Sequence, residues 1–145
     1  MKLPSLLAAG LLSLASSSTA NAETELPTMQ TTNMGVTIEV LDAFVTTQNQ
    51  VVADLRVTND SGEPIKLAGN PTFTFAVTES GIQLPLVNRQ SNPAINVGDG
   101  ESIATRLSFK GTPETLSDEI SIIFNANNGR DDAAPLVAFN NLKLR

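Results

Sequence analysis

Only carboxylates, lysine and arginine could carry acid–base chemistry in this chain, because its 145 residues include no histidine, cysteine, tryptophan or tyrosine. The missing side chains exclude serine–histidine–aspartate and cysteine–histidine hydrolysis, and zinc or copper sites built on imidazole or thiolate. Two adjacent acidic pairs remain, Asp118-Glu119 and Asp131-Asp132. Neighbours on a strand point to opposite faces, so neither pair is expected to form a catalytic dyad. We therefore predict no enzyme activity, no catalytic residue and no cofactor.

Three turn-like segments could offer oxygen ligands to calcium. They are residues 59–63, residues 99–101 and the pair Asp131-Asp132. None matches a calcium-loop pattern, and Asn, Asp, Ser and Gly are the residues that turns require. Asn59-Asp60-Ser61 also matches the acceptor pattern for N-glycosylation, which short turns often match by chance. We expect plain turns at these places and predict no metal-binding residue.

Residues 1–22 have the pattern of a secretory signal peptide. Lys2 provides the positive start, a stretch rich in leucine and alanine follows, and Ala20 and Ala22 are the small residues expected before a cleavage site. We predict cleavage before Glu23 and export to the periplasm or the extracellular space; an uncleaved membrane anchor is the alternative. No cysteine follows the apolar stretch to carry a lipid, so we expect no stable membrane insertion after cleavage.

The predicted mature chain is acidic, because loss of Lys2 changes the net charge from −6 to −7. A negative surface repels phosphates, so we expect no nucleic acid partner. Residues 23–33 are polar and show no periodicity, which predicts a flexible leader before a single domain over residues 34–145. Met29 and Met34 are the only methionines left for a thioether copper site, and we expect none there.

Apolar and polar residues alternate in several short runs of the predicted domain, which is typical of strands with one buried and one solvated face. Turn signals separate the runs, and Asn128-Gly129 predicts a hairpin before the last strand. Only residues 112–118 could hold a helical turn. The chain is therefore predicted to be all-β, an antiparallel immunoglobulin-like β-sandwich of seven to eight strands, with a closed barrel as the alternative. The predicted core includes Leu55, Phe73, Phe75, Leu107, Phe109 and Ile122.

The last strand, around residues 136–144, breaks the alternation. Leu136, Ala138 and Leu142 share one face of an ideal strand, while Phe139 falls on the other. Either a bulge near Asn140-Asn141 changes the phase and returns Phe139 to the core, or Phe139 faces outward and could bind a partner.

Five segments in the middle of the chain follow a recognisable order: VVADLRVTN (51–59), EPI (63–65), FTFAVTESG (73–81), VGDGE (97–101) and LSFKGTP (107–113). This order resembles secreted bacterial immunoglobulin-like domains of unknown function, a group that includes the mycobacterial immunoprotective extracellular antigens. The resemblance covers about residues 36–124 and implies a sandwich, export and no known enzymatic activity. The same stretch is similar to the immunoglobulin-like intracellular proteinase inhibitors of bacilli, although the tryptophan segment of those inhibitors is missing. Residues 63–81 and the turn at residues 98–101 carry this second likeness.

These observations favour an exported, non-catalytic binding or accessory domain of the bacterial envelope or secretome with an unknown protein partner. A proteinase inhibitor of the same fold is one alternative. A structural subunit that assembles through strand exchange is another.

Overall fold

The computed structural model describes residues 23–116, 118–127 and 133–145. The predicted signal peptide, the Asn128-Gly129 turn and the pair Asp131-Asp132 lie outside these ranges. Within them, no helix is long and apolar enough to cross a membrane. The described strands are β2 Thr28–Thr31, β3 Val36–Val45, β4 Gln50–Asn59, β5 Ile65–Lys66, β6 Phe75–Thr78, β7 Gln83–Pro85, β8 Asn96–Val97, β9 Ser102–Lys110, β10 Glu119–Phe124 and β11 Val137–Lys143; two 3₁₀ turns, η2 Pro71–Phe73 and η3 Pro113–Thr115, accompany them.

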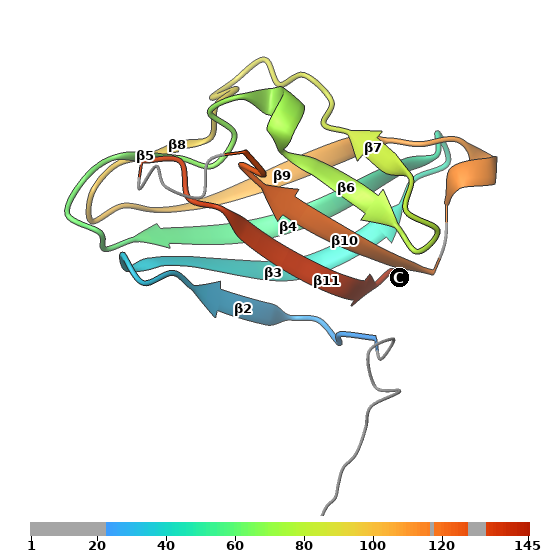
Figure 1. Cartoon of the computed structure of the whole chain (residues 1–145), viewed down its shortest axis with the longest axis horizontal. Coiled ribbons are helices and arrows are strands. Elements are labelled where there is room, and N and C mark those ends of the chain that lie inside the picture. The colour runs from blue at the N-terminus through green and yellow to red at the C-terminus, as the bar shows by residue number, and fades with distance from the viewer. Residues whose placement is uncertain (1–22, 117, 128–132) are drawn as a thin grey trace, which may run out of the picture.

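Two four-stranded sheets form the sandwich, in the orders β2-β3-β4-β9 and β11-β10-β6-β7, and β5 pairs with β8 beside them. Figure 1 shows the second sheet lying over the first. Every pairing between these strands is antiparallel. The predicted all-β sandwich is thus confirmed. The described residues contain ten strands rather than seven or eight, because β2 arises from the predicted leader and β5 and β8 are two-residue strands.

The alternating runs place their apolar residues between the two sheets. Val36, Ile38 and Val40 of β3 are fully buried, and the alternate residues of β4 from Val51 to Val57 are at most 1% exposed. Leu107, Phe109 and Ile122 are buried as well, as the alternation predicted. A period of two therefore locates the inner face of these strands correctly.

The predicted phase of β6 is wrong. Phe75 is only half-buried on the outer face, while Thr74 and Ala76 are buried, and Phe73 lies in the turn η2. Thr74 belongs inside because its hydroxyl donates to the Leu67 carbonyl and accepts the backbone N–H of Asn125, each at 3.1 Å. A buried hydroxyl is tolerated when it is hydrogen-bonded. These two bonds set the phase that turns Phe75 outward.

The predicted leader, residues 23–33, contains regular structure. β2 pairs with β3 along its whole length, and the backbone N–H of Thr24 donates to the Asn141 carbonyl at 2.7 Å. Ladder hydrogen bonds need no apolar side chains, and three of the four β2 residues are exposed. This explains why the strand left no hydrophobic pattern in the sequence.

A bulge corrects the phase of the last strand. Ile120 lies opposite Leu142 and Ile122 lies opposite Phe139, so Asn140 and Asn141 together face one residue of β10. Asn141 has a φ of 56°. Phe139 is consequently 1% exposed. The bulge interpretation is confirmed, and the interpretation of Phe139 as an exposed binding residue is wrong.

Candidate functional site

The two described oxygen-rich loops, residues 59–63 and 99–101, lie together, and the carboxylates of Asp99 and Glu101 accept backbone N–H groups of these turns. Asp99 Oδ1 accepts the backbone N–H of Gly62 at 2.9 Å, and Glu101 Oε1 accepts that of Gly98 at 2.6 Å. Among the described residues, no group of three or more His, Cys, Asp or Glu side chains could hold a metal ion. Asp99 and Glu101 thus act as hydrogen-bond acceptors within the turns, in agreement with the expectation of plain turns.

Asn59, the candidate glycosylation acceptor, is fully buried. Its Nδ2 donates to the carbonyls of Glu63 and Val97 at 2.7 and 3.0 Å. Its Oδ1 accepts the hydroxyl and the backbone N–H of Ser61. With both ends of the amide engaged inside the fold, Asn59 organises the turn after β4 and offers no accessible nitrogen for modification.

The acidic pair Asp118-Glu119 is split between two environments, since Asp118 is exposed and Glu119 is 9% exposed. Burial raises the pKa of the Glu119 carboxyl, and the nearby carboxylates of Glu79 and Glu23 raise it further. Met29 and Met34 are 61% and 43% exposed. Asp131-Asp132 lies outside the described residues.

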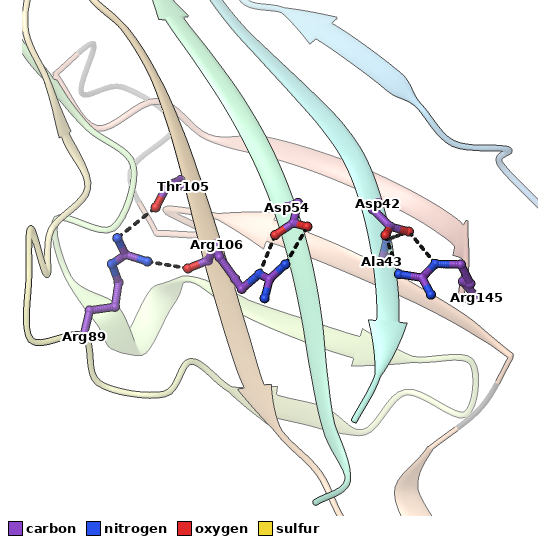
Figure 2. Close-up of polar contacts among 7 residues, drawn as sticks. All are labelled: Asp42, Ala43, Asp54, Arg89, Thr105, Arg106 and Arg145. Atoms are coloured by element: carbon purple, nitrogen blue, oxygen red, sulfur yellow. Dashed lines mark hydrogen bonds and ion pairs between the residues drawn. The ribbon is translucent and has the colours of Figure 1, made fainter. Parts of the chain in front are cut away.

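The outer face of the β2-β3-β4-β9 sheet carries a row of ion pairs (Figure 2). Asp42 and Asp54 are register partners on β3 and β4, and like charges directly opposite each other destabilise a sheet. Each receives its own arginine through two hydrogen bonds. Arg106 binds Asp54 at 2.6 and 3.0 Å, and Arg145 binds Asp42 at 2.6 and 3.2 Å.

The same two guanidinium groups cover Phe44. Their central carbons lie 5.5 Å (Arg106) and 4.8 Å (Arg145) from the ring centroid, within the range of cation–π attraction. Arg89 donates to the Arg106 carbonyl and to the Thr105 hydroxyl, as Figure 2 shows, and so ties its own segment to β9. Sequence reasoning missed these arginines because their partners lie far away in the chain.

The outer face of the other sheet is uncharged around Phe75, whereas Glu119 of β10 and its register partner Lys143 of β11 lie towards one end. One transverse row consists of Ala138, Ile123, Phe75 and Pro85, which are successive register partners across β11, β10, β6 and β7. Ala138, Ile123 and Phe75 are half-buried, and Pro85 is exposed. Val77, with its register partners Ser121 and Gln83, forms the next row. We call these seven residues the neutral face; none of them carries a charge.

A hollow of about 360 Å³ lies at the β7 end of the neutral face. Phe75, Pro85 and Leu86 contribute apolar surface to its lining, and Gln83 and Asn88 contribute side-chain amides. Amides can donate and accept hydrogen bonds without a net charge. The hollow could therefore seat an uncharged, partly apolar group.

No protein-family model matches this chain, and no curated protein matches its sequence. Several solved structures share its fold. The secreted protein MPT63 of Mycobacterium tuberculosis is 13% identical, with a TM-score of 0.52 over 83% of this chain and 99% of that one. The YjhA protein of Bacillus subtilis is 10% identical, with a TM-score of 0.52 over 83% of this chain and 98% of its own.

A functionally unknown protein from Listeria monocytogenes is 11% identical, with a TM-score of 0.53 over 81% of this chain and 82% of its own. At these identities the likeness concerns the fold. The resemblance to secreted bacterial sandwich domains of unknown function, noted in the sequence, is confirmed at that level.

Proposed function

We propose that this chain is an exported, non-catalytic binding domain of the bacterial envelope or secretome. It recognises a protein partner through the neutral face around Phe75. The pattern of residues 1–22 supports export, and a structurally similar protein is itself described as secreted. The observation that carries the proposal is the uncharged apolar row of Ala138, Ile123, Phe75 and Pro85 on an exposed sheet surface.

The contrast between the row of ion pairs and the neutral face supports the neutral face as the proposed binding side. The face with Asp42 and Asp54 satisfies its charges internally, whereas the neutral face has apolar side chains partly in water. Apolar surface exposed in this way is typical of protein contacts, whose buried centres are depleted in charge. The partner should therefore present a complementary uncharged apolar patch.

Face-to-face contact also fits the state of two of the four sheet edges, those of β11 and β9. The edge of β11 is bound by Thr24, whose N–H donates to the Asn141 carbonyl and whose carbonyl accepts the Lys143 N–H. The edge of β9 is bound by the Val87 N–H, which donates to the Ser108 carbonyl. Addition of a partner strand at either edge would have to displace these bonds.

The test is capture from native envelope extract with three baits: the parent chain, Phe75→Gln and Phe44→Gln. Phe44 is the matched control because it is a half-buried phenylalanine on the opposite outer face. We expect a protein held by the parent and by Phe44→Gln and lost with Phe75→Gln. Equal capture by all three baits would contradict the proposal, as would a captured protease that the chain inhibits equally well after Phe75→Gln. Dimers that Phe75→Gln abolishes would identify the partner as a second copy instead.

A further inference from the structure

A second hollow, of about 330 Å³, lies away from the neutral face and combines leucines with opposite charges. It lies between the N-terminal segment, β3 and the end of β11. We call it the leucine hollow. Its lining consists of Glu25, Leu26, Leu41, Asp42, Lys143, Leu144 and Arg145.

Backbone hydrogen bonds hold the three walls of the leucine hollow in place. Lys143 N–H donates to the Thr24 carbonyl at 3.1 Å, and Arg145 N–H donates to the Ala43 carbonyl at 2.9 Å. Antiparallel pairing of β2 with β3 connects the remaining two walls. Small-molecule sites are usually concave and largely formed before the ligand arrives. The leucine hollow shares this feature, but four of its seven lining residues are charged.

The two ion pairs of the leucine hollow differ in strength. Asp42 and Arg145 share two hydrogen bonds, and Arg145 also stacks on Phe44. Lys143 Nζ and Glu25 Oε2 are 3.8 Å apart, beyond hydrogen-bond distance, and their side chains are 52% and 77% exposed. Exposed pairs of this kind are weak. Lys143 and Glu25 are therefore the cation and the anion that can exchange partners.

We propose that the leucine hollow binds a small zwitterion with an aliphatic body, such as an apolar α-amino acid. Its carboxylate would form an ion pair with Lys143, and its ammonium would form one with Glu25. Its side chain would contact Leu26, Leu41 and Leu144. Charge balance favours this class. A ligand with only a carboxylate would pair with Lys143 and leave Glu25 without its cation. A ligand with only an ammonium would pair with Glu25 and leave Lys143 without its anion.

The test is titration of the purified chain, followed by amide NMR shifts, with leucine and three fragments of it. The fragments are 4-methylpentanoate, which lacks the ammonium, 3-methylbutylamine, which lacks the carboxylate, and glycine, which lacks the aliphatic body. Leucine has about nine non-hydrogen atoms, and a ligand of that size and ordinary efficiency should bind the chain with a dissociation constant of about 1–10 mM. We expect shifts at residues 25–26, 41–42 and 143–145, and weaker binding of every fragment.

Variants of the exposed pair complete the test. Lys143→Gln and Glu25→Gln should each weaken leucine binding about two- to fivefold, whereas Lys110→Gln, an exposed lysine on β9, should leave it unchanged. Phe75→Gln should also leave it unchanged, which separates this inference from the proposed function. Absence of shifts in these segments at about 50 mM leucine, several times the expected constant, would overturn the proposal. Equal binding of leucine and 4-methylpentanoate would overturn it as well.

Discussion

The rings of Phe124 and Phe139 meet edge to face, with centroids 6.4 Å apart and an angle of 82° between the ring planes. Both side chains are at most 1% exposed. The contact joins β10 and β11 beside the bulge at Asn140-Asn141, and it exists only because the bulge turns Phe139 inward. The irregularity in the last strand is thus part of core packing.

Phe139→Ala should reduce the free energy of unfolding by about 3–5 kcal/mol, because it removes a fully buried aromatic ring and leaves a cavity. Chemical denaturation of the single variant measures this. Combined with Phe124→Ala in a double-mutant cycle, it should show a coupling of about 0.5–1.5 kcal/mol, as expected for an aromatic pair. A loss below about 1 kcal/mol for Phe139→Ala would contradict its position in the core.

Phe75→Ala should cost much less, about 1 kcal/mol, because the ring is half-buried on the outer face and its removal leaves no internal cavity. Phe109→Ala, at a fully buried position, is the matched comparison and should cost about 3–5 kcal/mol. Equal losses in the two variants would show that Phe75 lies in the core, as the alternating pattern had predicted.

Asn141→Val should lower the free energy of unfolding by about 1–2 kcal/mol more than Asn141→Gly does. Asn141 has a φ of 56°, a left-handed conformation that Gly adopts freely, that Asn tolerates and that β-branched residues resist. Asn140→Val, at the exposed neighbouring position, controls for loss of polarity. Similar effects of the two valine substitutions would argue against a conformational cause.

Millimolar calcium should leave the melting temperature unchanged. Asp99 and Glu101 already accept backbone N–H groups of Gly62 and Gly98. Bound calcium at about 100 times its dissociation constant would add about 2.7 kcal/mol to the free energy of unfolding. Thermal melts with and without calcium therefore test whether these loops bind the ion. A rise of several degrees that Asp99→Asn removes would establish an ion site in these loops.

Strands in which apolar and polar residues alternate could be predicted from the sequence. In β3 and β4 this alternation correctly places Ile38 and Leu55 in the core. The alternation gave the wrong inner face for β6. The face that β6 turns inward depends on the hydrogen bond between Thr74 and Asn125, which are 51 positions apart. The sequence was silent on β2, which is held by backbone bonds that any side chains allow.

The candidate sites were harder to predict than the fold, because each arises where distant segments meet. Asp42 and Arg145 are 103 positions apart, and the row through Phe75 exists only once the register of four strands is set. Alternation gives the face of a residue but not its neighbours across the sheet. For this reason the sequence predicted no site where the structure places a neutral face and a leucine hollow.

Glu119→Gln should raise the melting temperature at pH 7 and leave it unchanged near pH 3. Burial, helped by Glu79 and Glu23, raises the pKa of the Glu119 carboxyl above its ordinary value. Below the ordinary glutamate pKa of about 4.3, the carboxyl is protonated in both folded and unfolded chains and carries no penalty. As the pH rises toward the raised pKa of the folded state, the folded chain holds more protons than the unfolded chain, so stability falls. The penalty is complete above the raised pKa, and glutamine, which does not titrate, avoids it.

Melting curves of the parent and of Glu119→Gln across pH 3–7 should therefore diverge as the pH increases. Glu63→Gln is the control, because Glu63 is exposed and should give curves parallel to those of the parent. A gain in Glu119→Gln that is the same at every pH would mean that the substitution acts through packing. A loss at pH 7 would mean that the ionised carboxylate stabilises the fold, which is the opposite of what its burial beside two other acids implies.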